Sequence, residues 1–271
     1  MSNSPARSRA PVYEETLEDR QYATTLARGL EVLRCFSPEE PFLGNKQLAE
    51  RTGLPKPTIS RFTYTLVRLG YLRHCQDSSK YQLGSAVVSL GYPMLARVRV
   101  RQIVRPAMAE LADQFDCSVS MGVRDRLGIV YVETSRSRAP FAPQFSDIGR
   151  WLPIISSSMG HAYLAACDVA ERRSVLNEIK VKTPELWREY HKSAESSLKD
   201  FARRGFCIPD KHMQPEVRAV AVPLVRPVEG ERLVFNCVVN VEQVRKGALE
   251  GRMGPRLAAM VKALEFSLKT Y

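Results

Sequence analysis

The sequence predicts an α+β protein with two domains. Its length of 271 residues suits roughly two domains. The first 84 residues combine apolar positions at helical spacing with one short hairpin pattern. The remainder contains two pairs of strand-like segments and several long helical segments in runs, which is typical of an antiparallel sheet with segregated helices.

Composition favours a protein with a buried core and a polyanionic partner. Hydrophobic residues make up 44% of the chain, charged residues 25%, and the formal net charge is +11. Such a charge favours nucleic acid first and an anionic membrane surface second. No stretch approaches the roughly 20 apolar residues that span a bilayer, and the polar N-terminus lacks the apolar core of a secretory signal. We therefore expect a cytoplasmic protein with no membrane partner.

The cysteines predict neither a metal site nor a disulfide framework. No two of them form a C-x-x-C pair, and they are widely separated. We expect buried thiols in a reducing compartment, and no cofactor. The six cysteines are Cys35, Cys75, Cys117, Cys167, Cys207 and Cys237.

Residues 1–20 precede the first periodic segment and are expected to form a disordered arm. They carry Ser, Pro, Arg and Glu without helical or strand periodicity. Arg7 and Arg9 leave a second interpretation open, in which the arm touches DNA.

Three helices are predicted next. The first begins near Thr24 and ends before Pro38, because proline disfavours a helical residue before it. The second covers residues 47–52 and is stopped by Gly53, and the third begins near Pro57 and is closed by Gly70. The expected inner faces are Leu26, Leu30, Leu33 and Phe36 in the first helix, and Ile59, Phe62, Leu66 and Leu69 in the third.

A β-hairpin is predicted directly after the third helix. Residues 71–75 and 81–83 form the strands, and Asp77, Ser78 and Ser79 offer turn chemistry between them. A helix, a turn with glycine, a second helix and a hairpin together make up a winged helix-turn-helix, a motif that reads DNA.

The third predicted helix has the side chains that a major groove requires. Its polar front combines cations with small hydroxyl residues, which can bond base edges or phosphates. Residues 44–84 hold seven Lys or Arg against two acidic residues, a net charge of +5. An ordinary solvated helix face would also be charged, so the argument depends on the whole pattern. The expected DNA-binding residues are Lys46, Lys56, Thr58, Ser60, Arg61, Thr63, Tyr64, Arg73 and Lys80.

The rest of the chain predicts a connection and a larger second domain. Residues 85–115 show a helical pattern with expected interruptions near Pro93 and Pro106. We expect four parts: an arm at 1–20, a winged helix-turn-helix at 21–84, a linker helix at 85–100 and a domain at 101–271. In the last part the pattern predicts strands at 117–123, 128–134, 217–225 and 232–241, and helices at 156–167, 169–180, 184–204 and 254–268.

Three segments resemble the DNA-binding half of the IclR family of transcriptional regulators. They are LARGLEVL at 26–33, LAERTGLPKPTISR at 48–61 and LVRLGYL at 66–72, and YQLG at 81–84 is similar to the family's exit from the wing. A weaker resemblance continues to about residue 265. It implies a homodimer, often a tetramer, that binds a palindromic double-stranded DNA operator as a repressor or activator.

The same resemblance implies a GAF-like α/β effector-binding domain at the C-terminus, with a small organic acid or aromatic metabolite as ligand. A helix N-terminus near Ser156 suits a carboxylate, Gly160 would let a ligand approach the backbone, and Asp210 or Asn240 could hold a hydroxyl. The expected effector-binding residues are Leu152, Met159, Gly160, His161, Ala162, Asp210, Ala219, Val238 and Asn240. The chain departs from the family at His161, often Lys or Arg, and at Ala219 and Val238, often polar. The departures suit an apolar ligand or an occluded domain that needs none.

Two other classes of function compete with a DNA-binding regulator. The sequence has no G-x-S-x-G, H-E-x-x-H, P-loop or Rossmann glycine pattern, and Ser156–Ser158 with His161 lack an identifiable acidic partner, so an enzyme is not expected. An RNA-binding or nucleoid-type protein would bind nucleic acid with little sequence preference. That alternative, and a regulator that needs no ligand, stay open from the sequence.

Overall fold

The computed structural model describes residues 21–97, 100–138, 147–245 and 247–268. The predicted arm lies outside the described residues. The chain divides into two compact units, Met1–Arg97 and Val98–Tyr271.

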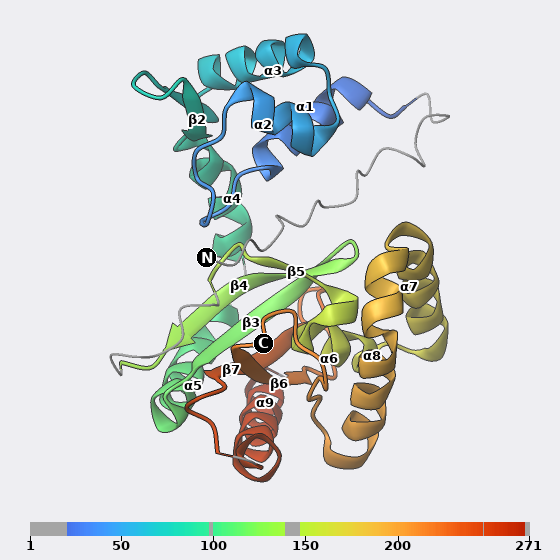
Figure 1. The fold of residues 1–271 in the computed structure, drawn as a ribbon. Helices are drawn as coiled ribbons and strands as arrows, with labels where there is room; N and C mark the ends of the chain where they lie inside the picture. The colour runs from blue at the N-terminus through green and yellow to red at the C-terminus, as the bar shows by residue number, and fades with distance from the viewer. Residues whose placement is uncertain (1–20, 98–99, 139–146, 246, 269–271) are drawn as a thin grey trace. The chain divides into compact units, whose positions relative to one another are not determined.

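The first unit holds three helices, a hairpin and a fourth helix (Figure 1). Its core combines apolar residues from every part of the unit before α4: Val32, Phe36, Leu43, Leu48, Ile59 and Leu72. The elements are α1 (Thr24–Arg34), α2 (Asn45–Thr52), α3 (Lys56–Arg68), β1 (Leu72–Cys75), β2 (Lys80–Leu83) and α4 (Ala86–Arg97).

Local chemistry fixes the ends of α2. The Gly44 backbone N–H donates to the Gln47 side chain, 3.0 Å away, which begins the helix. Gly53 ends it in the left-handed conformation at φ 69°, as the sequence predicted. Strands β1 and β2 pair antiparallel, with Arg73 opposite Gln82 and His74 opposite Tyr81.

The predicted inner face of α1 is partly wrong. Leu26 and Leu30 are 65% and 45% exposed, whereas Val32 is fully buried. Leu69, expected inside α3, is likewise 60% exposed and follows the helix as its C-cap. The buried side of α1 passes through Val32, so it is rotated away from the row of Leu26 and Leu30 that the periodicity predicted.

The expected interruptions at the two prolines are also wrong. Pro93 lies inside α4, and Pro106 lies inside α5 (Val100–Phe115). A proline removes one backbone hydrogen bond and usually kinks a helix. In α5 the loss is offset by tertiary packing, because Val104, Met108 and Leu111 around Pro106 are buried.

A five-stranded antiparallel sheet in the order β5-β4-β3-β7-β6 forms the centre of the second unit. A register shift between Met121 and Gly122 turns Glu133 toward the face of α5, where it receives Arg101 and Arg105 at 3.0 and 2.8 Å. The strands are β3 (Ser118–Asp125), β4 (Gly128–Arg136), β5 (Trp151–Pro153), β6 (Val217–Pro223) and β7 (Val234–Asn240).

Helices cover both faces of this sheet (Figure 1). One face carries α5 and α9 (Gly254–Leu268), with Met108, Leu257 and Val261 buried between the helices and strands. The other face carries α6 (Ser158–Ala166). Outside α6 lie α8 (Pro184–Arg204) and α7 (Val169–Lys182), so α6 is enclosed between the sheet and another helix.

Most predicted elements of this unit are found. Helix α8 begins at Pro184 and is ended by Gly205 at φ 79°, and α9 has the predicted bounds. The sequence missed strand β5, the 3-10 turn η1 (Ile154–Ser156) and the π-helical turn η2 (Leu249–Met253). Together with the winged helix-turn-helix this is the α+β fold that the sequence predicted.

Candidate functional site

Helix α3 presents a cationic and hydroxyl-bearing side to solvent. Lys56, Ser60, Arg61 and Tyr64 are exposed, and Thr58 is half-buried. Ile59 packs the opposite side into the core. Within the described part of the chain, neither the Lys56 nor the Arg61 side chain has a hydrogen bond or ion pair, so both charges are available to a partner.

Thr63 belongs to the buried side of α3, which corrects its place among the expected DNA contacts. It is fully buried, and its hydroxyl lies 3.0 Å from the Ile59 carbonyl oxygen and 3.4 Å from Asn45 Oδ1. The sequence analysis missed Asn45, whose Nδ2 donates to Ser60 Oγ at 3.2 Å. Asn45 thus ties the start of α2 to the solvent side of α3.

The remaining expected contacts lie on α2 and the hairpin. Lys46 is exposed and lies 4.0 Å from Glu50, a distance that leaves its ammonium free to move. Arg73 is exposed on β1 beside Gln82, and Lys80 is half-buried at the start of β2. The first unit therefore carries cations on two sides of α3.

In the second unit, the N-terminal end of α6 is packed tightly. Ser157 caps the helix, its hydroxyl accepting from the Gly160 N–H at 3.1 Å. A Cβ on Gly160 would lie 2.1 Å from the Ile154 carbonyl oxygen. Gly160 is therefore required by the turn that precedes α6, which replaces the predicted reason, access for a ligand.

His161 is an internal residue of this end and not an exposed ligand contact. It is fully buried; Nε2 donates to the Ile155 carbonyl oxygen at 2.9 Å, and Nδ1 lies 2.9 Å from Ser197 Oγ. Burial lowers the pKa of His161 to about 4, so the ring is neutral near pH 7. A neutral ring makes Nδ1 an acceptor, and the single Ser197 proton is shared between it and the Ile208 carbonyl oxygen.

The other expected effector residues are spread over three environments. Met159, Ala162 and, less deeply, Leu152 belong to the main core. Ala219 and Val238 form a separate small apolar cluster with Val217. Asp210 is exposed, and Asn240 Oδ1 accepts the Glu242 N–H in a turn.

Sequence reasoning missed two polar residues near the start of α6. Asn236 on β7 is 1% exposed and donates through Nδ2 to Tyr131 Oη at 3.1 Å and Ser158 Oγ at 3.3 Å. His212 follows Asp210 in the loop before β6. Asn236 Oδ1 and His212 Nε2 are buried without a hydrogen-bond partner in the described structure. Residue spacing in the sequence cannot predict that a buried atom lacks a hydrogen-bond partner, because this depends on the residues that surround the atom in the fold.

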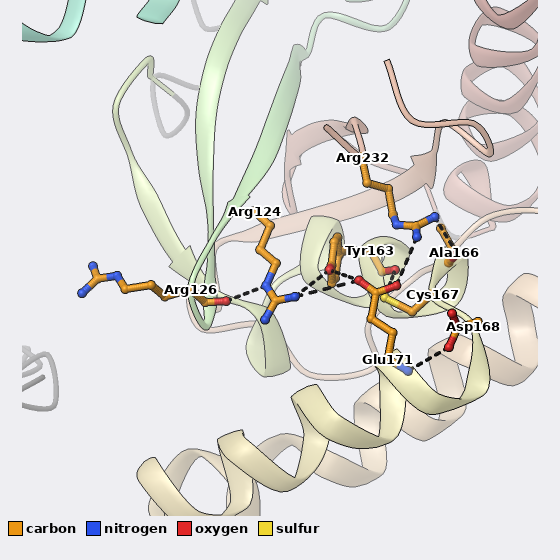
Figure 2. Close-up of polar contacts among 8 residues, drawn as sticks. All are labelled: Arg124, Arg126, Tyr163, Ala166, Cys167, Asp168, Glu171 and Arg232. Carbon is orange, nitrogen blue, oxygen red and sulfur yellow. Dashed lines mark hydrogen bonds and ion pairs between the residues drawn. The ribbon is translucent and has the colours of Figure 1, made fainter. Parts of the chain in front are cut away.

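The C-terminal end of α6 is held by a carboxylate with several donors (Figure 2). Tyr163 Oη donates to Glu171 Oε1 at 2.6 Å, and Arg232 donates to Oε2 at 3.1 Å. Arg124 donates to Tyr163 Oη at 2.9 Å and lies 3.9 Å from Glu171. Glu171 at the start of α7 therefore joins the β3–β4 hairpin, α6 and the segment before β7.

These contacts shift the pKa values of the groups involved. The hydrogen bond from Tyr163 holds the pKa of Glu171 below its ordinary value, so its carboxylate stays ionised. Burial raises the pKa of the Tyr163 hydroxyl, and burial together with the charge of Glu171 raises the pKa of the Cys167 thiol to about 11. Both remain protonated donors.

Two classes of site receive no support from the described residues. No group of three or more His, Cys, Asp or Glu side chains among them could hold a metal ion. Among the helices that the structure describes, none is long and apolar enough to cross a bilayer.

Comparison with known proteins agrees with this arrangement. The IclR helix-turn-helix domain matches residues 25–74, and the bacterial transcriptional regulator IclR C-terminal domain matches residues 93–262. The transcriptional regulator TsaQ1/TsaQ2 of Comamonas testosteroni is 34% identical over 90% of this chain and 88% of its own length. An IclR-family regulator from Brucella abortus superposes with a TM-score of 0.81, at 43% identity over 94% of this chain and 97% of that one. An IclR homologue from Microbacterium hydrocarbonoxydans, solved with 4-hydroxybenzoate, shares the fold at a TM-score of 0.67 and 19% identity over 91% of this chain and all of that one.

The fold and the exposed α3 side define a DNA-binding transcriptional regulator with a separate sensing domain. The chain belongs to the IclR family, as the matches to both of its domains show. The family consists of transcriptional regulators and not enzymes, in agreement with the expectation from sequence.

Proposed function

We propose that this regulator binds a palindromic operator as a homodimer in the cytoplasm and changes its operator affinity when a small aromatic or short-chain organic acid binds the second unit. The exposed side of α3 is the observation that carries the proposal. A recognition helix enters the major groove with its N-terminal residues toward the bases. Its Arg and Lys side chains bond guanine edges or phosphates there. The proposed contacts are Lys46, Lys56, Thr58, Ser60, Arg61, Tyr64, Arg73 and Lys80.

Exposed apolar side chains support the dimer. Leu26 and Leu30 on α1 are joined by Val88, Leu90, Tyr92 and Met94 on α4, which are 45–71% exposed. Exposed apolar side chains of this kind are typical of an interface, and a two-fold operator requires the two α3 helices of a dimer to lie about 34 Å apart, one turn of DNA. Sedimentation of wild-type protein and of Leu90→Lys tests it; equal mass for both would contradict pairing through α4.

The effector proposal is supported by the apolar cluster at Val217, Ala219 and Val238 and by the N-terminus of α6, whose dipole favours an anion. Relatives point in the same direction, since one homologue is solved with 4-hydroxybenzoate. A ligand that favours one arrangement of the second unit would change the spacing of the α3 helices through the 85–100 linker.

Arg61→Ala in the full chain tests operator reading. We expect the loss of a base or phosphate contact to weaken operator binding by about 1–3 kcal/mol. Arg173→Ala is the matched control, because it removes the same charge from an exposed position on α7. Footprinting upstream of the protein's own gene should show a short protected palindrome. Diffuse protection, or equal affinity of the Arg61 and Arg173 variants, would contradict the proposal.

A further inference from the structure

The hydroxyl groups of α3 do not all use their protons inside the protein. Thr63 Oγ1 donates to the Ile59 carbonyl oxygen at 3.0 Å. Thr65 Oγ1 donates to the Arg61 carbonyl oxygen at 2.9 Å. Serine and threonine in helices commonly bond the carbonyl four residues earlier in this way. Ser60 is exposed, and its hydroxyl donates to no acceptor among the described residues, so its proton is available to a partner.

Asn45 occupies the acceptor side of the same hydroxyl. It is the first residue of α2, and its Nδ2 donates to Ser60 Oγ at 3.2 Å. Its Oδ1 lies 3.4 Å from Oγ1 of the buried Thr63. Because an amide carries its donors on nitrogen and its lone pairs on oxygen, this orientation turns a donor toward Ser60.

The Asn45 contact decides what Ser60 can offer to DNA. A serine hydroxyl has one proton and two lone pairs, and the Asn45 nitrogen cannot accept that proton. A hydroxyl that loses its water in a DNA groove and leaves its proton unbonded costs free energy. An acceptor on the DNA satisfies the Ser60 proton, whereas a second donor leaves it without a partner.

Ser60 lies in the N-terminal half of α3, the part of a recognition helix that contacts bases. In the major groove guanine presents O6 and N7 and thymine presents O4, which are all acceptors, whereas cytosine presents an amino donor. We propose that Asn45 is a positioning residue for base recognition: it makes Ser60 a donor that selects guanine or thymine over cytosine. The inference rests on the proposed binding of an operator by α3 and deepens it.

The experiment first selects operators from a pool of random duplexes with the full chain, as wild type and as Ser60→Ala. Fluorescence anisotropy then gives Kd for the selected palindrome and for base-pair variants changed equally in both half-sites. We expect Ser60→Ala to lose discrimination at one base pair of each half-site. There the wild type should prefer guanine or thymine to cytosine by about fivefold per half-site, the effect of one neutral hydrogen bond.

Asn45→Asp reverses the polarity of the contact at nearly constant size. A carboxylate only accepts, so the Ser60 proton turns toward it, the Ser60 lone pairs face the groove, and the preference should shift toward cytosine. An acid in the first turn stabilises a helix, so this variant should fold, which thermal melts check. Glu50→Gln is the control for charge: it changes an exposed residue of α2 by one charge unit and should alter affinity equally for every base pair.

Asn45→Ala removes the donor without supplying an acceptor. Ser60 is then free to donate or accept, so its preference should fall below about twofold, and Ser60→Ala added to this variant should change discrimination no further. This double-mutant cycle decides alone if Asn45→Asp binds no operator. A structural role of Asn45 would weaken binding to all sequences and leave the preference in place.

Three results would overturn the inference. Uniform weakening by Ser60→Ala would place its hydroxyl on a phosphate. A cytosine preference of the wild type at the Ser60 base pair would show that Ser60 accepts. An unchanged preference in both Asn45 variants would show that Asn45 does not set it. In each case the selected palindrome leaves the proposed function standing, whereas failure of the wild type to select any palindrome overturns the function on which the inference rests.

Discussion

The two ends of α6 satisfy their polar groups in opposite ways. At the C-terminal end the Glu171 carboxylate receives Tyr163 and Arg232, with Arg124 close by, and the Glu171 side chain is 31% exposed (Figure 2). At the N-terminal end the groups are buried, and two acceptors lack donors. The difference teaches that the chain itself satisfies the polar groups at one end of the helix, whereas at the other end it leaves two buried acceptors without a donor among the described residues.

The largest loss of stability should come from adding a side chain at the tightly packed N-terminal end of α6. In Gly160→Ala the new methyl group meets the Ile154 backbone, which cannot move like a flexible side chain. We expect the free energy of unfolding of the second unit to fall by about 3 kcal/mol in denaturant titrations. Gly251→Ala is the control, since nothing lies within 4 Å of its Cβ position, and it should change stability by less than about 1 kcal/mol. Equal effects at both glycines would show that the end is loosely packed.

Removing the Glu171 anchor at the C-terminal end of α6 should lower the free energy of unfolding somewhat less. Glu171→Ala leaves the Arg232 side chain and the Tyr163 hydroxyl without their shared acceptor and removes the carboxylate that lies 3.9 Å from Arg124. We expect a loss of about 2 kcal/mol, discounted because the carboxylate is 31% exposed. Glu178→Ala on the same helix removes only an exposed pair with Lys182 and should cost about 0.5 kcal/mol or less. If the two variants were equally stable, Glu171 would be no anchor.

Features set by local chemistry could be predicted from the sequence. The bounds of α8 follow from Pro184 and Gly205, and the end of α2 follows from Gly53, because these residues act through their own backbone. The winged motif was recognised for the same reason. Periodicity was less informative where the partner is far away in the sequence. It placed Leu26 and Leu30 inside and Thr63 outside, and the structure has the reverse.

The location of the sensing site stays a prediction. The resemblance pointed to the stretch around α6 and the last two strands, in which Gly160 and His161 are buried packing residues. Asn236 could not have been found, because a free acceptor is a property of Tyr131, Ser158 and Ala221 around it as much as of the asparagine. Whether a buried polar atom has a hydrogen-bond partner depends on the tertiary structure, which a single sequence does not display.

As the pH falls, the buried N-terminal end of α6 should lose stability before the C-terminal end, which Glu171 anchors. The native pKa of His161 is about 4, against about 6.5 when unfolded, so the unfolded chain binds the extra proton first and stability falls as the pH drops through 6.5 toward 4. We expect a loss of about 2 kcal/mol from His161 alone between pH 7.5 and pH 5. His161→Gln should reduce that difference in urea titrations at the two pH values. Glu171 cannot produce it, because its lowered pKa keeps it ionised in this range.

The smallest effect on folding is expected at Asn236. The two hydroxyl groups that its Nδ2 serves can rotate toward other partners, and the oxygen removed in Asn236→Leu had none, so the unliganded protein should change by less than about 1 kcal/mol. Thermal melts measure this directly. A large loss would mean that the amide is part of the scaffold, like Glu171, and the contrast between the two ends of α6 would disappear. A small loss would show that the unsatisfied oxygen contributes little to the fold, in contrast to the Glu171 carboxylate.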